Sequence, residues 1–396
     1  MQKRIYLSPP HMGGSELKYI RQAFEENWIA PLGPNVDNFE KDICGFSGTK
    51  YAAALSSGTA AIHLALILLG IERDDEVLCQ SLTFSASVNP VVYQHAVPVL
   101  IDSESATWNM CPETLEEAIK DRMAKGKKPK AIILVHLYGQ PAKLDELMVI
   151  SGKYGIPIIE DAAEALGAGY RSSSSSSSGS KSKIKNKKSK IKKVGIFGKI
   201  GIFSFNGNKI ITTSGGGALV SEDKALVEKA RYLATQACED VPHYQHLAIG
   251  YNYRMSNICA GIGRGQMEVL PERIKQRRAN YQYYYNALKN VDAISFNPEM
   301  DGTFSTRWLT CILIDKKLSG GITPEDIRLA LEKENIEARP LWKPMHLQPI
   351  FANYPYYGSD TAEKLFKKGL CLPSGSSLGK DDLDKIIEII RKEIGK

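Results

Sequence analysis

The sequence predicts an α/β protein with a mostly parallel central sheet between helices, followed by a smaller C-terminal α+β domain. Short, continuously apolar runs alternate with helical stretches through the first half of the chain, which is typical of strands buried on both faces. The length of 396 residues suits one large doubly wound domain and one smaller domain. We expect the large domain to span residues 1–247 and the small domain 248–396.

The first elements alternate in type along the chain. A buried helix is predicted to begin near Gly58, after a capping serine, and to end at Gly70. The predicted strands that follow are 76–79, 97–101, 131–135 and 156–159, and the helices between them are 85–94, 111–124 and 143–154. Two further apolar runs, 201–203 and 218–220, flank a polar turn. Strands separated by helices in this way favour a parallel sheet covered on both faces.

The second half begins with an amphipathic stretch at 223–237, and the stretch 281–288 continues a long helix that would join two domains. In the final third, 307–314 and 336–340 are strand-like. Thr323-Pro-Glu-Asp326 forms a capping box with proline at the first helical position, and the helix it starts is expected to end near Glu334. A last helix is predicted at 381–394. Two helices on a small sheet would make the second domain.

Composition indicates an ordinary soluble protein, with 43% hydrophobic and 24% charged residues. The apolar runs are shorter than the roughly 18 residues that a membrane span needs. The N-terminus lacks the apolar region of a signal peptide, so we expect a cytoplasmic protein without membrane contact. The seven scattered cysteines include no Cys-x-x-Cys pair, which argues against a disulfide framework or a metal site.

The net charge of +7 comes from one segment. Residues 171–193 hold one arginine, eight lysines and no acidic residue, and removing those nine charges from +7 leaves −2 for the rest. A protein whose basic charge is confined in this way is not expected to bind nucleic acid. The segment is rich in serine and lysine, so we interpret it as a flexible insertion in a surface loop.

Lys209 is the candidate catalytic residue. It lies in the polar turn Ser204-Phe-Asn-Gly-Asn-Lys209, which glycines at 215–217 keep open to a bulky ligand. A lysine at the end of a strand in such a turn can present its amine for a Schiff base. A solvated loop lysine is the usual alternative, and a second motif upstream decides against it.

That motif is Ile156-Pro-Ile-Ile-Glu-Asp161-Ala-Ala-Glu164-Ala-Leu-Gly167. Besides a lysine, pyridoxal 5'-phosphate (PLP) requires an acid at the pyridine nitrogen, phosphate donors and a group against the ring. Asp161 ends an apolar strand, where ligands sit in open parallel sheets. Gly58 and Thr59 begin a helix whose N–H groups and dipole suit a phosphate, and Ser204 adds a hydroxyl. Phe84 follows a strand and is placed either against the ring or in the core. Together these residues indicate a PLP site.

Five motifs occur in this chain in one order: Ser-Gly-Thr-Ala, Leu-Thr-Phe, Glu-Asp-Ala-Ala, Ser-Phe-Asn-Gly-Asn-Lys with its three glycines, and Gly-Tyr-Asn-Tyr-Arg-Met-Ser-Asn. Their order resembles the order of the same motifs in the DegT/DnrJ/EryC1/StrS sugar aminotransferases. The resemblance extends from Leu7 to the C-terminus, apart from residues 171–193. The resemblance implies the type I fold of PLP-dependent transferases (aspartate aminotransferase-like) and activity on nucleotide-linked keto-sugars. It also implies a homodimer with shared active sites.

The resemblance assigns roles to individual residues. It implies Lys209 as the Schiff-base lysine, Asp161 at the pyridine nitrogen and Phe84 on the ring. Thr59 and Ser204 would hold the phosphate, with Asn252 reaching it from the other subunit. Many members carry His or Gln where this chain has Glu164, near the cofactor's phenolic oxygen or ring.

Within the family the chain is similar to the 4-aminotransferases of the UDP-N-acetylbacillosamine pathway. This implies transfer of an amino group from L-glutamate to C4 of a UDP-linked 4-keto-6-deoxy-N-acetylhexosamine. In the family two segments face the sugar nucleotide, and here they correspond to Asn27, Trp28, Ile29 and Ala30, and to Arg339, Pro340, Leu341, Trp342 and His346. A basic, aromatic cluster of this kind suits a diphosphate and a ring. For the second segment, a loop that merely joins the domains is the alternative.

Three other interpretations remain at this point. The first is an aminotransferase of the same family that acts on another nucleotide keto-sugar, at C3 or with another stereochemistry. The second is a regulator with this fold and no turnover, although no appended DNA-binding domain is present. The third is a binding module whose functional part is the lysine-rich segment.

Overall fold

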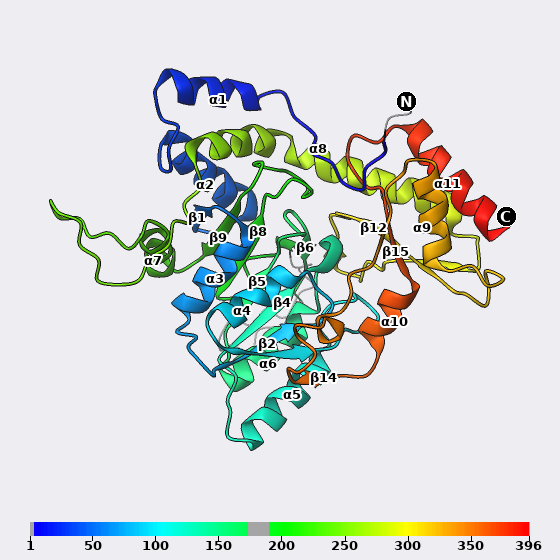
Figure 1. Cartoon of the computed structure of the whole chain (residues 1–396), viewed down its shortest axis with the longest axis horizontal. Coiled ribbons are helices and arrows are strands. Elements are labelled where there is room, and N and C mark those ends of the chain that lie inside the picture. The colour runs from blue at the N-terminus through cyan, green and yellow to red at the C-terminus, as the bar shows by residue number, and fades with distance from the viewer. Residues whose placement is uncertain (1–3, 173–189, 396) are drawn as a thin grey trace, which may run out of the picture.

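The computed structural model describes residues 4–172 and 190–395, in which an eight-stranded sheet carries helices on both faces (Figure 1). The strand order is β1-β9-β8-β5-β4-β2-β3-β14. Both β1 and β8 pair antiparallel with β9, and the other neighbours pair in parallel, so β9 alone runs opposite to the rest. The predicted mostly parallel sheet is confirmed. Its strands are β1 (Tyr51–Leu55), β2 (Glu76–Gln80), β3 (Val97–Ile101), β4 (Ala131–Val135), β5 (Ile158–Asp161), β8 (Ile200–Ser204), β9 (Gly217–Ser221) and β14 (Tyr356–Tyr357).

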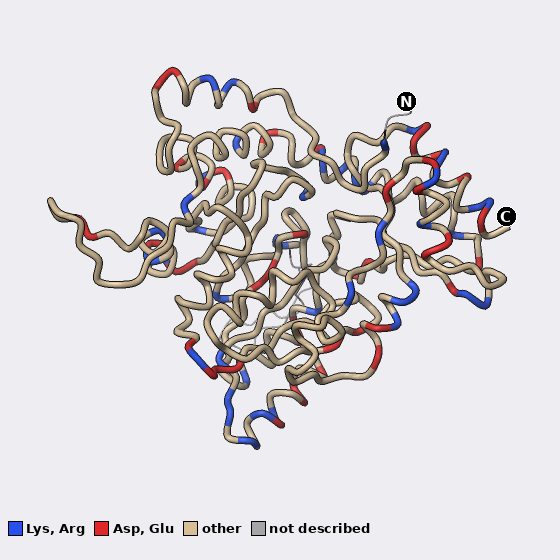
Figure 2. Tube along the Cα trace, in the orientation of Figure 1, with Lys and Arg blue, Asp and Glu red and all other residues tan. Residues whose placement is uncertain are grey.

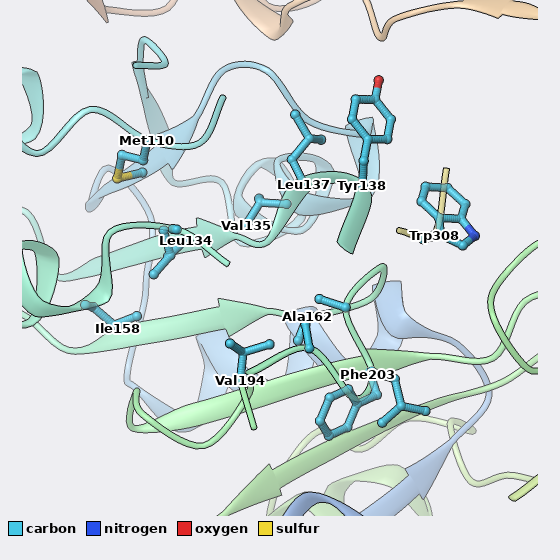
Figure 3. Close-up of a cluster of buried hydrophobic side chains, with 14 of the residues drawn as sticks. Met110, Leu134, Val135, Leu137, Tyr138, Ile158, Ala162, Val194, Phe203 and Trp308 are labelled. Carbon is cyan, nitrogen blue, oxygen red and sulfur yellow. The ribbon is translucent and has the colours of Figure 1, made fainter. Parts of the chain in front are cut away.

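Two hydrophobic clusters cover the two faces of this sheet, because side chains alternate in direction along each strand. One cluster packs the sheet against α2 (Pro34–Ser47), α5 (Pro112–Ala124), α6 (Leu144–Tyr154) and the first half of α8 (Asn257–Leu288). Figure 3 shows part of it, with strand residues such as Leu134 and Ile158 facing Met110 and Val194. The other cluster packs the opposite face against α3 (Gly58–Leu68), α4 (Asn89–Tyr93) and α7 (Lys224–Ala234).

The C-terminal part has its own antiparallel sheet of order β10-β12-β15-β13. Its strands are β10 (Ile294–Phe296), β12 (Thr310–Ile314), β15 (Gly369–Leu372) and β13 (Arg339–Pro340). A third hydrophobic cluster packs this sheet against the last turns of α8, α9 (Pro324–Lys333) and α11 (Lys380–Ile394). The predicted capping box at Thr323 is present. This arrangement of helices on a small sheet agrees with the predicted α+β part.

Helix α8 runs from the large sheet to the small one (Figure 1). It has 32 residues and begins at Asn257, where the side chain of Ser256 accepts the backbone N–H of Cys259. Its first half contacts α1 (Glu16–Glu25) and α2, and its second half contacts α11. One helix therefore belongs to both packing units. We propose that the boundary expected at residue 247 instead falls along this helix.

Several predicted elements differ from the structure in extent. Pro90 and the preceding loop divide the helix expected at 85–94 into η1 (Ser85–Ser87) and α4. The strand expected at 307–314 begins at Thr310, because Arg307 has a left-handed φ of 52°. Only Arg339–Pro340 of the expected strand 336–340 pairs with a neighbour. Several elements had no sequence prediction, among them α1, α2, β1, β10, β14, β15, α10 (Thr361–Lys368), η2 (Leu137–Gly139) and η3 (Met345–Leu347).

The predicted insertion at 171–193 lies largely outside the described residues. Its last two residues form β7 (Lys192–Lys193), which pairs antiparallel with β6 (Gly169–Tyr170), and β6 pairs with β11 (Thr303–Phe304). The predicted flexible segment is therefore too long at its C-terminal end, because Lys192 and Lys193 belong to a strand. The Lys193 ammonium lies 3.4 Å from the centre of the Phe46 ring, which fixes this end on α2.

Acidic and basic residues are interspersed over the described part of the trace (Figure 2). Across the described ranges, no helix combines the length and the apolar character that a bilayer crossing requires.

Candidate active site

A cavity of about 300 Å³ lies at the carboxyl ends of the parallel strands. Asp161 is the last residue of β5 and Ser204 the last of β8, so the sheet itself places both at this edge. The cavity brings together most of the residues predicted to hold a cofactor. Those that line it are Gly58, Thr59, Phe84, Asp161, Glu164, Ser204 and Lys209.

Lys209 enters the cavity from the loop between β8 and β9. Its ammonium lies 4.3 Å from the centre of the Trp308 ring and 3.7 Å from Oε1 of Glu164. The side chain is only 11% exposed. The indole N–H of Trp308 donates to the carbonyl of Asn208 at 2.8 Å, so the ring and the lysine loop are tied together. A cation–π contact and a carboxyl group therefore hold one amine in a mostly buried position.

The carboxylate of Asp161 is fixed at both oxygens. The hydroxyl of Ser87 donates to Oδ2 at 2.6 Å, and the N–H of Ala163 donates to Oδ1 at 3.1 Å. Because Ser87 gives its only hydroxyl hydrogen to Asp161, Thr83 is the donor in the 2.8 Å contact between the two hydroxyls. The orientation of Asp161 is thus set by a short chain of hydroxyl groups.

The N-terminus of α3 forms another wall of the cavity. Ser57 caps the helix by accepting the N–H of Ala60 at 3.0 Å, and the first intrahelical bond runs from Ala61 to Ser57. The N–H groups of Gly58 and Thr59 precede that bond and are free to bind an anion. A Cβ on Gly58 would lie 3.2 Å from Cβ of Ser204, so glycine permits the helix and the strand end to approach closely.

Glu164 is fully buried, and its carboxyl group contacts both Lys209 and the backbone. Oε2 accepts the N–H of Tyr138 at 2.7 Å. Burial raises the pKa of Glu164 to about 7, although the charge of Lys209 and the Tyr138 hydrogen bond lower it and Asp161 adds a smaller increase. The carboxyl group therefore changes its protonation near neutral pH, beside the amine of Lys209.

A larger cavity of about 640 Å³ lies next to the first. Both are lined by Thr83, Phe84, Asn208 and Trp342. The ring of Phe84 contacts that of Trp342, with 4.9 Å between centres. The larger cavity adds aromatic and cationic side chains, and these are Tyr6, Trp308, Arg339 and Lys343. It can accept a molecule that is both ring-containing and anionic.

The structure separates the residues predicted to face a sugar nucleotide. Arg339 and Trp342 line the larger cavity, whereas Leu341 is buried in the core and Pro340 is exposed to solvent. His346 lies behind the cavity wall, where its Nδ1 is 2.7 Å from the Ser81 hydroxyl. Burial lowers the pKa of His346, and the nearby Glu363 partly offsets this.

Two predicted groups lie away from both cavities of their own chain. Asn27, Trp28, Ile29 and Ala30 are exposed. Asn252 is also exposed and bridges to Thr235. These placements are compatible with a site completed by a second subunit, which the single chain does not contain.

Among the residues without a sequence prediction, three orient groups of the site. Ser87, Tyr138 and Trp308 act through contacts between segments far apart in the chain. The motif Leu-Thr-Phe lies just before Ser87, which is the only local signal. For Trp308 the apolar run that contains it predicts a strand rather than a wall of the site.

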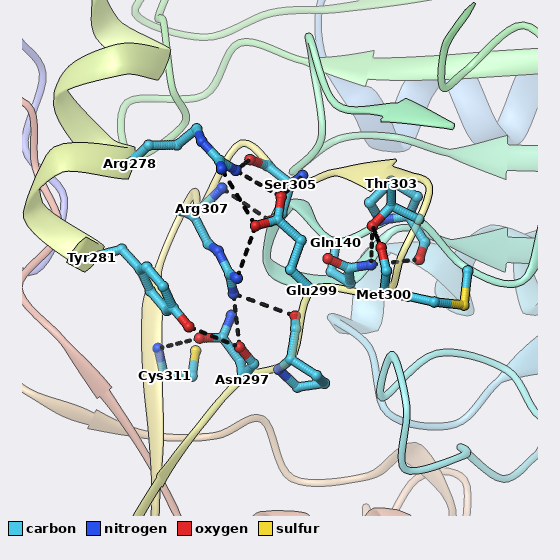
Figure 4. A network of polar contacts seen from close by, with 12 residues as sticks. Gln140, Arg278, Tyr281, Asn297, Glu299, Met300, Thr303, Ser305, Arg307 and Cys311 are labelled. Atoms are coloured by element: carbon cyan, nitrogen blue, oxygen red, sulfur yellow. Dashed lines mark hydrogen bonds and ion pairs between the residues drawn. The ribbon is translucent and has the colours of Figure 1, made fainter. Parts of the chain in front are cut away.

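Arg307, the residue before Trp308, belongs to a polar network that Figure 4 shows. Arg278 and Arg307 both donate to the carboxylate of Glu299, and Arg307 also donates to the carbonyl of Asn297 at 2.7 Å. The Arg307 guanidinium lies 3.7 Å from the centre of the Tyr281 ring. These contacts hold the left-handed backbone of Arg307, and they thereby fix the direction of the residue that follows it.

A sequence model of the DegT/DnrJ/EryC1/StrS aminotransferase family matches residues 10–391. The chain belongs to this family. The resemblance stated from five motifs is therefore confirmed, as is the type I fold of PLP-dependent transferases.

Relatives and solved structures agree with this assignment. The aminotransferase is 52% identical over 394 residues to EpsN of Bacillus subtilis (strain 168), whose provisional name is pyridoxal phosphate-dependent aminotransferase, with 98% of this chain and 96% of EpsN covered. It is 34% identical over 391 residues to the GDP-perosamine synthase of Escherichia coli O157:H7, with 98% of each covered. A family aminotransferase from Brucella abortus superposes with a TM-score of 0.84 at 28% identity, covering 96% of each chain.

The aminotransferase is PLP-dependent, and the smaller cavity fits that cofactor. The cavity offers the Lys209 amine, the oriented Asp161 carboxylate at the sheet edge and a helix N-terminus that begins with a closely packed glycine, which suits a phosphate. When bound, PLP supplies a ring that stabilises negative charge on the substrate carbon.

Proposed function

We propose that this aminotransferase moves an amino group from L-glutamate to C4 of a nucleotide-linked 4-keto-6-deoxy sugar, most specifically a UDP-linked N-acetylhexosamine of the bacillosamine type. The observation that carries the proposal is the pair of adjacent cavities with four shared residues. One contains the reactive amine. The other combines aromatic rings with Arg339 and Lys343, which suits a nucleotide diphosphate.

In this proposal the predicted cofactor residues of the smaller cavity have separate tasks. Lys209 would link to PLP and then, as a free amine, remove and return the substrate proton. Asp161 would face the pyridine nitrogen, and Thr59, Gly58 and Ser204 would hold the phosphate. Phe84 would lie on the ring. Glu164, beside Lys209, would hold or release a proton as the charge of the amine changes.

The choice of nucleotide is the part that the relatives leave open. A relative named GDP-perosamine synthase is 34% identical over nearly the whole chain, so a GDP-linked keto-sugar is the second candidate. The purified protein, supplied with PLP and glutamate, should be given UDP-, GDP- and dTDP-linked 4-keto-6-deoxy sugars. Mass spectrometry then identifies which one gains an amine. A product only from the GDP-linked sugar would overturn the UDP assignment and leave the reaction class intact.

Replacing the lysine tests the reaction class itself. We expect Lys209→Ala to lose the visible absorbance of lysine-linked PLP and to reduce transamination by about 10³-fold or more. A variant with unchanged absorbance would show that Lys209 is not the linking residue.

We also propose a cytoplasmic homodimer whose active sites contain residues of both subunits. The segment 238–250 presents Val241, Tyr244, Leu247 and Ile249 to solvent, and Trp28 and Ile29 are similarly exposed. Exposed apolar groups of this size commonly mark an interface between subunits. Mixing inactive Lys209→Ala with inactive Asn252→Ala should restore part of the activity if the sites are shared. No recovery from a stable mixed dimer would contradict this arrangement.

A further inference from the structure

Arg277 lies on α8, is 1% exposed and contacts four segments that are distant in sequence. Its Nη1 donates to the carbonyls of Trp308 at 2.7 Å and Ser374 at 3.3 Å. Its Nη2 donates to the hydroxyl of Ser8 at 3.0 Å and to the carbonyl of Lys209 at 3.4 Å. One guanidinium therefore joins the loop of Lys209 to the residue whose ring faces its amine.

All four acceptors of Arg277 are uncharged. Throughout residues 4–172 and 190–395, no carboxylate forms an ion pair with this side chain. Burial, and secondarily the like charge of Arg273, lowers the pKa of Arg277 to about 9. A buried cation without a carboxylate partner is unfavourable for folding, so a contribution to stability does not account for Arg277.

The acceptors of Arg277 are themselves linked at the residue before the lysine. The carbonyl of Asn208 accepts the hydroxyl of Ser8 at 2.7 Å and the indole N–H of Trp308 at 2.8 Å. The peptide units on both sides of the Lys209 Cα are thus held by the same small set of groups. This fixes where the lysine side chain starts and where the Trp308 ring lies.

We propose that Arg277 is a positioning residue for Lys209, holding its backbone against Trp308 so that the amine stays in the cavity. The planar fork of arginine is needed because its two terminal nitrogens serve different segments at fixed angles. A lysine in its place would keep the positive charge and lose that geometry. The inference rests on the proposed function only in taking Lys209 as the reacting amine.

The test compares Arg277→Lys with Arg273→Lys, a matched control one helical turn earlier. Arg273 donates to the carbonyls of His11 and Met12 and contacts neither Lys209 nor Trp308. The first measurement uses the cofactor-free protein: trinitrobenzenesulfonate modifies amines, and peptide mass spectrometry gives the rate at Lys209. We expect Arg277→Lys to raise this rate several-fold and Arg273→Lys to leave it unchanged. An equal rate in the wild type and Arg277→Lys, or an equal rise in both variants, would overturn the proposal.

The second measurement separates kcat from KM for glutamate. A misplaced amine should lower kcat by up to about 10²-fold in Arg277→Lys while KM changes little. If that variant does not fold, Ser8→Ala removes one Nη2 acceptor and the hydroxyl bond to Asn208, and should change both readouts in the same direction. A Ser8→Ala variant with wild-type labelling and kcat would then count against the proposal. The two proposals can fail separately. If Arg277→Lys raises the labelling rate of Lys209 but the wild type transaminates none of the sugars, the proposed function is rejected and the role of Arg277 is supported.

Discussion

Nζ of Lys209 lies 3.7 Å from Oε1 of Glu164, and the second oxygen of that carboxyl group is fixed by the N–H of Tyr138. The amine and the acid are therefore neighbours, and their side chains are 11% and 4% exposed. Because the pKa of Glu164 is raised to about 7, mainly by burial, the charge of the pair changes close to neutral pH. This contact makes both the stability and the chemistry of the site sensitive to pH.

The first prediction concerns Glu164→Gln. Since the pKa of Glu164 is raised from 4.5 to about 7 on folding, the wild type loses stability as pH rises through this window, and glutamine does not. The variant should gain stability relative to the wild type by up to about 3 kcal/mol between pH 4.5 and pH 7. Urea unfolding of the cofactor-free proteins across this range measures the difference. A difference that does not change with pH would show that Glu164 is ionised at an ordinary pKa.

The second prediction concerns Ser87→Ala, which removes the donor to Oδ2 of Asp161. A hydrogen bond to a charged group is worth about 1.5–3 kcal/mol, so the carboxylate should lose its orientation. We expect kcat to fall about tenfold or more. Ser87→Thr keeps the hydroxyl and should recover most of the rate. Equal rates in Ser87→Ala and the wild type would show that Asp161 is held well enough by Ala163 alone.

The third prediction tests the helix N-terminus with Gly58→Ala. The added Cβ would lie 3.2 Å from Cβ of Ser204 and would narrow the space for a phosphate. PLP affinity should fall, measured as quenching of tryptophan fluorescence. Gly207→Ala is the control, because a Cβ there meets nothing within 4 Å. An equal loss of PLP affinity in Gly58→Ala and Gly207→Ala would contradict a specific need for glycine beside the phosphate.

The fourth prediction concerns removal of residues 173–189. Gly169 pairs with Lys193 and Tyr170 with Lys192, so the two ends of the deleted stretch are joined by a strand pair. A short Gly-Ser turn should close the gap with little strain. We expect PLP binding and transamination to stay at wild-type level, measured by absorbance and product formation. Loss of both would instead favour a role for the lysine-rich segment in the site.

The local sequence was enough to predict the position of a residue that its own helix or strand fixes. Asp161 and Ser204 end parallel strands, and Gly58 begins a helix, so all three were predictable at one edge of the sheet. The order of five motifs identified the family without a structure. The ends of helices and strands depend on hydrophobic periodicity and on capping, and both are set by residues that are neighbours in the sequence.

The tertiary structure alone decided which groups surround the amine of Lys209. Trp308 and Glu164 contact the amine, and Arg277 contacts the backbone carbonyl of the same residue. These contacts come from three separate segments and depend on how α8 and the small sheet pack on the large one. Burial also set the pKa of Glu164, and burial is a property of the packed chain. The sequence predicted Lys209 as the reactive residue, and packing determined its position and the protonation of its neighbour Glu164.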